Sequence, residues 1–288
     1  MKTSIPIAVS TGSLYPIPTL ESIQHLNELG IQDVELTLQS SEFFLTFERK
    51  LSMTILPELL RLVQMGTLRV RSIHAPTIPG AHSNNLWARK QYLIHSIETC
   101  SLLGATILVI HPLHLLQDQE SALSYLSGNG TSLQSVLLPG MYEIMEQAHS
   151  VNVTLAMENI QDWLDEIFFN APTSMSCFLR DMDHPAVGCT FDLMHAQVAG
   201  ILDDFMDLLS ADIVNIHASD LLLPTKRVAI GKGAIDWNRL GPKLEALPKL
   251  RQITVELSNP QDDEIIESVK LLSDLMTSSA MYSASRRL

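Results

Sequence analysis

The sequence has little that would mark a secreted or membrane protein. It carries three cysteines, Cys100, Cys177 and Cys189, without paired spacing, which disfavours a disulfide framework and is typical of a reducing compartment. The first residues, MKTSIPIAVSTGS, contain an apolar run too short for a signal peptide, and no stretch approaches the roughly 18 apolar residues of a membrane span. We therefore expect a cytoplasmic protein without membrane association.

Basic residues are also scarce. The chain has 19 lysines and arginines against 32 aspartates and glutamates, a formal net charge of −13. A protein that binds nucleic-acid backbones without sequence preference normally carries the opposite balance, so a nucleic-acid partner is disfavoured. A glycine-rich phosphate turn is also lacking after the first strand, where the sequence reads STGSLYP, and this disfavours a doubly wound open sheet.

Short apolar or β-branched runs alternate with longer segments of helical periodicity along the chain. We expect strands at residues 5–10, 33–38, 69–75, 106–112, 153–159, 187–193, 212–220 and 252–258. Eight strands alternating with helices are typical of a (β/α)₈ TIM barrel. The sequence therefore predicts one α/β domain over residues 1–276, followed by a flexible tail at residues 277–288.

Most of the expected strands carry, at or near their end, a side chain that can bind a metal or titrate. These side chains are Glu35, His74, His111, Glu158, Asp192 with His195 soon after it, His217 and Glu256. In a TIM barrel the C-terminal ends of all strands open onto the face where active sites lie. A single strand-end histidine or glutamate is more often a structural hydrogen-bonding group, but the whole set predicts a common pocket.

Four of these residues form a plausible metal-binding set. Three carboxylates and one imidazole, from Glu158, Asp192, His217 and Glu256, suit one divalent Mn, Mg or Co ion and tolerate Zn. The absence of thiolate ligands disfavours a structural zinc site. Three carboxylates against a divalent ion leave one negative charge over, so one glutamate can take up a proton during a reaction while the metal stabilises an oxyanion.

Several short motifs resemble those of the xylose isomerase-like TIM-barrel superfamily, which groups sugar and sugar phosphate isomerases and epimerases with metal-dependent apurinic endonucleases. The motifs run along nearly the whole chain and are specific through their order and spacing. They are SIHAP at residues 72–76, VIHP at 109–112, AMEN at 156–159, FDLMHA at 191–196, NIHASD at 215–220, GKGAIDW at 231–237 and VELS at 255–258.

The resemblance implies roles for individual residues. In the isomerases and epimerases, one metal is held by the positions that correspond to Glu158, Asp192, His217 and Glu256. The two glutamates, as the catalytic pair, exchange a proton on the carbon beside a carbonyl, through an enediolate. The resemblance also implies that His195 contacts substrate oxygens and that a basic residue after the seventh strand does the same. Arg227 is our candidate for that residue, and His74, His111 and Glu35 are further candidates for positioning the substrate.

Two other function classes stay open. The endonuclease branch of the superfamily uses three zinc ions, and the resemblance matches His74 and His111 to ligands of its first site. Its third site pairs the histidine that matches His195 with an aspartate and a histidine, whose positions correspond to Lys226 and Val228. Neither Lys226 nor Val228 can serve as that ligand, so an endonuclease IV-like enzyme would lack the third zinc. A dinuclear hydrolase with a second metal at His74 and His111 fits the same residues. A barrel that binds a metabolite without turnover is the third class, because fold does not fix function.

The sequence favours an enzyme, because a binding protein would have no use for a glutamate on each side of its ligand. We predict a metal-dependent isomerase or epimerase acting on a small sugar, sugar phosphate or polyol. Substrate choice is expected in the loops at residues 40–50, 76–86 and 114–133. A homo-oligomer is compatible with the sequence, which does not fix the number of chains.

Overall fold

The computed structural model describes residues 5–37, 55–75, 86–111, 115–117, 120, 124–125, 131–159, 171–222 and 226–285. Most of the three loops expected to select the substrate lie outside these residues. Within the described part of the chain, no helix is both long enough and apolar enough to cross a membrane.

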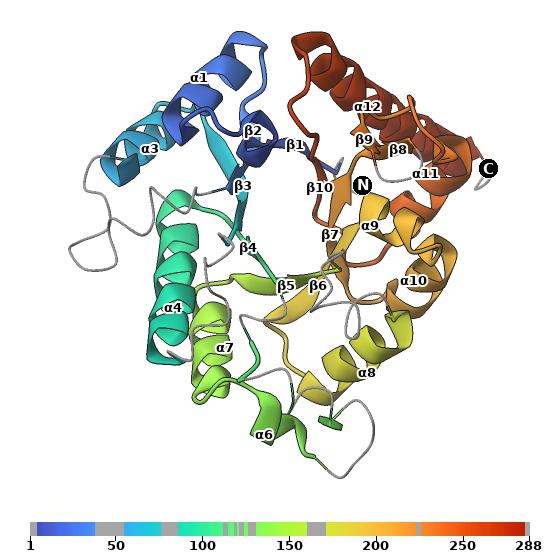
Figure 1. Ribbon diagram of the computed structural model, residues 1–288. Helices are drawn as coiled ribbons and strands as arrows, with labels where there is room; N and C mark the ends of the chain where they lie inside the picture. Colours follow the sequence, from blue (N-terminus) through green and yellow to red (C-terminus); the bar gives the residue numbers. More distant parts are fainter. Residues whose placement is uncertain are drawn as a thin grey trace.

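Eight parallel strands close into a barrel, which confirms the predicted fold class (Figure 1). Around the barrel the order is β1, β10, β7, β6, β5, β4, β3, β2, so the first strand pairs with both the second and the last. The strands are β1 (Ile7–Ser10), β2 (Asp33–Thr37), β3 (Arg69–His74), β4 (Ile107–Ile110), β5 (Thr154–Glu158), β6 (Val187–Asp192), β7 (Ile213–Ala218) and β10 (Gln252–Val255).

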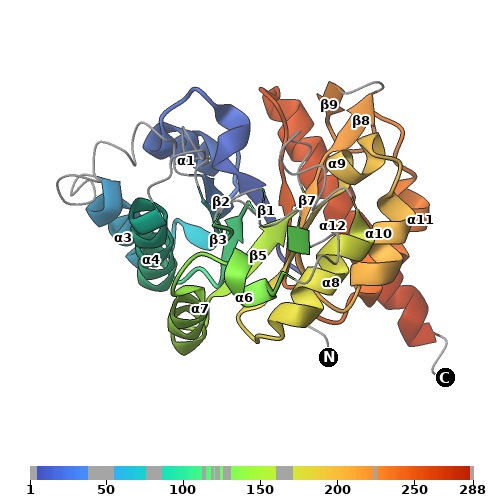
Figure 2. The ribbon, with the colours of Figure 1, turned by 60° about the horizontal axis from the view of Figure 1, so that its bottom comes forward.

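Helices surround the barrel, as Figures 1 and 2 show. A 3₁₀ helix, η1 (Thr11–Leu14), follows the first strand. The α-helices of the described residues are α1 (Thr19–Glu28), α3 (Ile55–Gln64), α4 (Leu86–Leu103), α6 (Leu133–Val136), α7 (Met141–Ser150), α8 (Pro172–Met182), α9 (Leu193–Val198), α10 (Leu202–Leu209), α11 (Trp237–Ala246) and α12 (Asp262–Ser285). Because α12 continues through Ser285, part of the segment expected as a tail is helical.

The strand sequences explain this architecture. Parallel strands covered by helices are buried on both faces and therefore read as continuous apolar runs. All four residues of β4 and all five of β5 are buried. The side chains that face the helices form the large hydrophobic core, whereas a much smaller apolar cluster of Ile107, Val109, Ala156 and Val214 is separate from it.

The middle of the barrel is polar. Glu35, Ser72, Asn215, Gln252 and Thr254 are almost completely buried there and hydrogen-bond to one another. A buried polar group is stable only when its partners are present, so this network fixes the side chains in place. It lies directly below the polar strand ends and supports them.

The expected seventh strand is divided into two elements. β7 ends at Ala218, and Asp220 begins a separate antiparallel hairpin of β8 (Asp220–Leu222) and β9 (Lys226–Val228). The prediction of one strand over residues 212–220 was therefore wrong at its C-terminal end. The hairpin rises beyond the strand ends on the face where the predicted site lies (Figure 2).

Candidate metal centre

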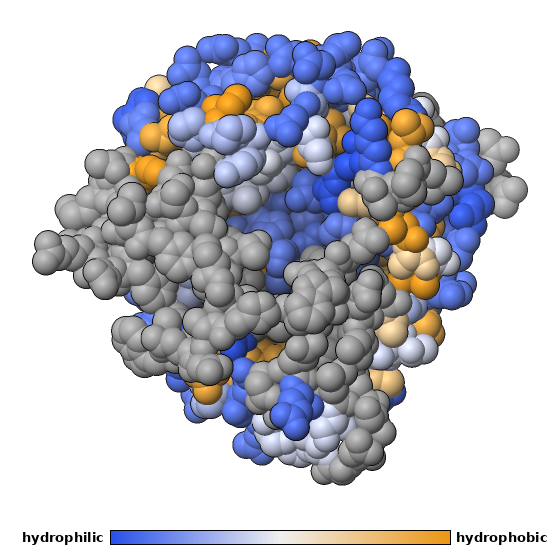
Figure 3. Space-filling view, viewed as in Figure 1, coloured by the Kyte–Doolittle hydropathy of each residue, from blue (hydrophilic) through white to orange (hydrophobic). Residues whose placement is uncertain are grey.

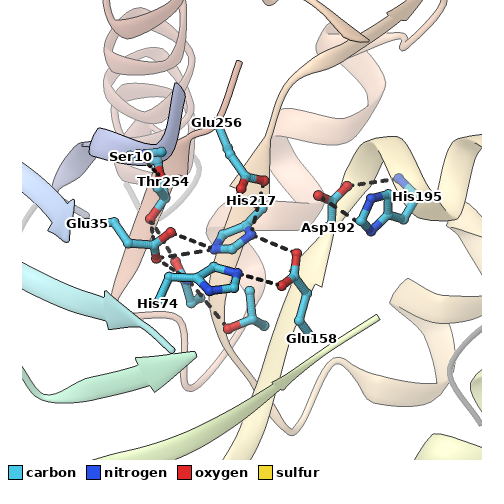
Figure 4. Close-up of polar contacts among 12 residues, drawn as sticks. Ser10, Glu35, His74, Glu158, Asp192, His195, His217, Thr254 and Glu256 are labelled. Atoms are coloured by element: carbon cyan, nitrogen blue, oxygen red, sulfur yellow. Dashed lines mark hydrogen bonds and ion pairs between the residues drawn. The ribbon is translucent and has the colours of Figure 1, made fainter. Parts of the chain in front are cut away.

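The four predicted ligand side chains meet at the C-terminal ends of the strands. Glu158 ends β5, Asp192 ends β6, His217 lies one residue before the end of β7, and Glu256 follows β10 directly. One ligand atom from each residue lies within 4.8 Å of the others. In Figure 4 the four side chains point toward one another, and in Figure 3 the centre of this face is hollowed and hydrophilic.

His217 is the centre of the cluster and is completely buried. Its Nδ1 lies 2.9 Å from Glu158 Oε1 and 3.3 Å from Glu256 Oε2. Its Nε2 lies 3.1 Å from Glu35 Oε1 on the opposite side of the ring (Figure 4). The nitrogen that faces the other predicted ligands is therefore Nδ1, and Nε2 is the nitrogen that faces a supporting carboxylate.

Glu35 lies inside the barrel and has no exposed surface. Its Oε2 accepts hydrogen bonds from Ser72 Oγ at 2.7 Å, and from Asn215 Nδ2 and Thr254 Oγ1, both at 3.4 Å. Oε1 has only His217 within ion-pair distance among the described residues. The structure thus places Glu35 against the back of His217, away from the open side of the pocket.

Glu158 also contacts two further histidines. Its Oε2 lies 3.1 Å from His74 Nε2 and 3.4 Å from His111 Nε2. Burial alone would raise the pKa of Glu158, but the neighbouring charge of His217 and the hydrogen bonds of His111, His217 and His74 hold that pKa well below 4.5. Burial likewise opposes protonation of His74, yet its hydrogen bond to Glu158 raises its pKa to about 9.

The ring orientation of His74 is set by its other nitrogen. Nδ1 donates to the carbonyl oxygen of Ala75 at 2.8 Å, which leaves Nε2 directed at Glu158. His74, Glu158 and His217 form a second group whose ligand atoms lie within 4.8 Å of one another. The geometry therefore allows two overlapping metal positions that share Glu158 and His217.

Asp192 has two structural duties besides its place in the cluster. It is the N-cap of α9, and its Oδ1 accepts from the backbone N–H of His195 at 2.8 Å. Asn159 brackets its backbone, because Asn159 Oδ1 accepts from the Asp192 N–H at 2.7 Å and Asn159 Nδ2 donates to the Asp192 carbonyl at 2.9 Å. His195 Nδ1 donates to the Asn159 carbonyl at 2.8 Å, which turns its Nε2 toward Arg227 at 3.4 Å.

Asn159 is the last residue of the AMEN motif but was not predicted as a site residue. The sequence signal that could have identified it is a polar amide directly after the glutamate that ends an apolar strand, and the structure shows Asn159 completely buried there. Its role in the structure is to lock Asp192 and His195 into one arrangement.

Arg227 reaches into the cluster from β9. Its Nη2 lies 2.9 Å from Asp192 Oδ2, and its Nη1 donates to Glu256 Oε2 at 2.5 Å and to the Glu256 carbonyl at 3.0 Å. Its side chain is only 12% exposed. Burial alone would lower the pKa of Arg227, but the charges of Glu256 and Asp192 raise that pKa above its ordinary value, so the guanidinium is a permanent cation between two predicted ligands.

Asp220 explains the GKGAIDW motif as a structural element. Its carboxylate accepts hydrogen bonds from Trp237 Nε1 at 2.8 Å and from the N–H groups of Leu221, Gly231 and Ile235 at 2.8, 3.0 and 3.0 Å. A Cβ on Gly233 would lie 2.4 Å from Asp220 Oδ1, so only glycine fits there. These contacts close the segment that carries β9 and therefore position Arg227.

The residues present suit a hard divalent cation. Three carboxylates and one imidazole nitrogen converge, and that imidazole is oriented through its other nitrogen by a carboxylate, which is the usual support of a metal-bound histidine. With Arg227 included, the three carboxylates carry a formal charge of −2, which one divalent ion balances.

Comparisons with known proteins agree with this fold. A model of the family described as xylose isomerase-like TIM barrel matches residues 23–275. An uncharacterised protein of Methanocaldococcus jannaschii is 24% identical over 189 residues, which cover 63% of this chain and 60% of that relative's length.

Solved structures resemble the whole chain. A D-tagatose 3-epimerase-like protein has a TM-score of 0.73 at 19% identity and covers 97% of this chain and 100% of its own. D-allulose 3-epimerase from Methylomonas sp., in complex with D-allulose, has a TM-score of 0.65 at 12% identity, and the match covers 98% of this chain and 97% of that protein. A xylose isomerase-like TIM barrel protein from Mycobacterium smegmatis, in complex with magnesium, has a TM-score of 0.67 at 17% identity, and the match covers 96% of this chain and 97% of that protein. At these identities the likeness shows the fold.

Proposed function

The chain belongs to the xylose isomerase-like TIM barrel family, and we propose that it is a metal-dependent isomerase or epimerase of a small sugar or sugar-like substrate. The observation that carries this proposal is the placement of Glu158 and Glu256. Their carboxylates, from β5 and from the end of β10, approach the same nitrogen of His217 at 2.9 and 3.3 Å. Strands β7 and β6 lie between β10 and β5 in the barrel, so the two glutamates come from separate sides of one pocket.

This arrangement fits transfer of a proton at a carbon beside a carbonyl. A glutamate on each side of the substrate can remove a proton from one face and return it to the same carbon or to the next one, through an enediolate. Epimerisation needs return on the opposite face of the same carbon, and isomerisation needs return on the neighbouring carbon. Structures of sugar epimerases among the similar folds support this reaction class.

Glu158, Asp192, His217 and Glu256 would hold the divalent ion. When bound, the ion supplies Lewis-acid stabilisation of the negative charge that develops on the substrate oxygen. Glu35 holds His217 in the orientation that directs Nδ1 at this position, and we assign it to that role instead of to substrate contact. Magnesium in one structure of similar fold supports a divalent metal.

His195, Arg227, His74 and His111 are the proposed substrate contacts. Arg227 presents a cation beside Asp192 and Glu256, where it can donate to substrate hydroxyl or carbonyl oxygens. His195 is held with its Nε2 toward the same region by Asn159. Both side chains are mostly buried, so a substrate bound to them would be shielded from water.

The test is exchange of solvent deuterium into the substrate, followed by proton NMR on a panel of ketoses that includes D-tagatose and D-allulose. The Mn-loaded protein should incorporate deuterium at the carbon beside the carbonyl, and Glu158→Gln should lower that rate by about 10²- to 10⁴-fold. Glu146→Gln, at an exposed glutamate on α7, is the matched control and should leave the rate unchanged. Undiminished exchange in Glu158→Gln would contradict the assignment of Glu158.

A dinuclear hydrolase is the second candidate, because His74 and His111 lie 3.1 and 3.4 Å from Glu158 Oε2 and because His74, Glu158 and His217 form a second group that could hold an ion. Metal analysis separates the two functions. About one divalent ion per chain supports the isomerase, whereas about two ions, one of them lost in His74→Ala, would favour the hydrolase.

A further inference from the structure

A second pocket lies at the other end of the barrel, among the starts of the strands that carry the site. It has a volume of about 930 Å³. Val153 and Thr154 at the start of β5, Val187 at the start of β6, and Arg251 just before β10 are among its lining residues. All of its lining residues belong to the described part of the chain, and none belongs to the candidate metal centre.

Arg251 is the distinctive group of this pocket. It is half-buried, and the hydrogen bonds of its guanidinium to described residues go to neutral oxygens, with Nη2 2.5 Å from Thr154 Oγ1 and Nη1 3.4 Å from the Thr106 carbonyl. Among the described residues, no carboxylate lies within ion-pair distance of it. Burial lowers its pKa, and no neighbouring charge offsets that effect, but an arginine stays charged even so. A partly buried charge without a counter-ion is unfavourable, so this position favours an anion.

The other charges of the pocket do not neutralise Arg251. Two carboxylates line the pocket, Asp183 and Asp212, and neither lies within ion-pair distance of Arg251. Asp212 pairs with Lys249 at 3.4 Å, and Arg180 pairs with its own neighbour Asp181 at 3.1 Å. Among the described residues, Arg251 is therefore a pocket cation without a direct counter-ion, in a protein whose net charge is −13. The net negative charge of the protein repels anions, so an anion that binds at Arg251 must be held by local contacts.

Arg251 also joins two functional strands. Its hydrogen bond to Thr154 connects the first residue of β5 with the residue that precedes β10. Glu158 ends the first of these strands and Glu256 directly follows the second. An anion bound to Arg251 would thus lie near the N-terminal ends of the two strands that deliver both proposed catalytic glutamates.

We propose that this pocket is a second ligand site that binds a phosphate group, free or carried by a small metabolite, through Arg251 with help from Lys249. Guanidinium groups bind phosphate oxygens in a bidentate manner, and the pocket has room for a group larger than phosphate itself. The site is separate from the proposed reaction and does not depend on it.

The experiment is isothermal titration of inorganic phosphate into the full chain at low ionic strength and neutral pH. Binding should weaken about tenfold or more in Arg251→Met, and about two- to threefold in Lys249→Met, at an exposed lysine whose loss leaves the fold intact. Arg239→Met, at an exposed arginine bound to Asp203, is the matched control and should not change the affinity. Thermal unfolding of each variant checks the fold, and Lys249→Met keeps the test valid if Arg251→Met does not fold.

Three outcomes would overturn the proposal. The first is that phosphate does not bind, and the second is that it binds equally to the wild type, Arg251→Met and Lys249→Met. The third is that Arg227→Met abolishes binding while Arg251→Met does not, which would place the anion in the metal centre. Ribose 5-phosphate distinguishes the two ligand sources. An Arg251-dependent affinity higher than that of inorganic phosphate identifies a phosphorylated metabolite, and an equal affinity identifies free phosphate.

Discussion

The two ends of the same strands carry opposite electrostatic arrangements. At the C-terminal end of β5, Glu158 meets three histidines, and beyond β10, Glu256 meets His217 and Arg227. At the N-terminal end, Thr154 of β5 meets Arg251, a single cation among neutral oxygens. At the C-terminal ends of β5 and β10 the charges are paired in close contact, whereas Arg251 at their N-terminal ends has no carboxylate within ion-pair distance among the described residues.

This difference follows from the architecture of the barrel. The strand side chains that face the helices are apolar and serve packing, whereas residues at the strand ends are less constrained by packing and can carry charged groups. A dense cluster of paired charges is stable only if every member keeps its partners, so a single substitution there should have a large effect. An isolated cation should tolerate substitution and respond chiefly to an added anion.

The largest effect should come from Glu256. Glu256→Gln should lower the turnover rate of the metal-loaded protein by about 10²- to 10⁴-fold, since the amide cannot exchange a proton. Circular dichroism should show an unchanged fold. Glu267→Gln, at an exposed glutamate that pairs with Lys232, is the control. Retained turnover in Glu256→Gln would remove the proposed catalytic contrast between the two ends.

The second-largest effect should be a loss of folding stability when Asp220 is replaced. Asp220→Ala leaves the Trp237 indole N–H and three backbone N–H groups without their acceptor, and unfolding free energy should fall by about 3 kcal/mol. Asp236→Ala removes a single exposed helix cap and should lower it by about 1 kcal/mol. Urea unfolding measures both, and equal losses would show that the hairpin carrying Arg227 is not anchored by Asp220.

Glu35 should control metal affinity from inside the barrel. Glu35→Gln replaces the carboxylate that faces His217 Nε2 and should weaken binding of Mn by about 10- to 100-fold, because such support makes a histidine a better ligand. Calorimetric titration of the metal-free protein measures this without any substrate. An unchanged dissociation constant would mean that Glu35 serves the stability of the barrel interior alone.

The smallest effect concerns Asp33, at the start of β2. Burial raises its pKa, but hydrogen bonds from Arg69 and Arg71 lower it more, so the folded pKa lies below 3.8. Its contribution to stability is therefore present above pH 3.8 and is lost as pH falls through the folded pKa. Asp33→Asn should lower the free energy of unfolding at pH 7 by only about 1 kcal/mol, because the ion pairs are partly exposed. The difference in unfolding free energy from the wild type should shrink in acid. A difference that is constant with pH would exclude the ion pairs as its cause.

The sequence predicted the barrel, and it predicted which strand-end side chains would lie together, because both depend on local signals. Strand-end residues such as Glu158 and Asp192 stand out against apolar runs, and the closed parallel sheet brings them together without further information. The end of β7 was predicted wrongly, because Asp220 continues the polar pattern while its side chain satisfies a distant turn. The position of Glu35 behind His217 depends on strand register and on contacts between residues far apart in the chain, which periodicity does not contain.

The closure of the segment around Asp220 has a consequence for how this protein can change. All four groups that bind its carboxylate lie on Leu221, Gly231, Ile235 and Trp237, so none of them lies between β8 and β9. We expect the chain between β8 and β9 to accept insertions or deletions while Asp220 still holds the segment that carries Arg227. Changes in length there would alter the edge of the pocket while the residues of the candidate metal centre keep their positions. Related proteins can then acquire different substrate preferences without first losing activity.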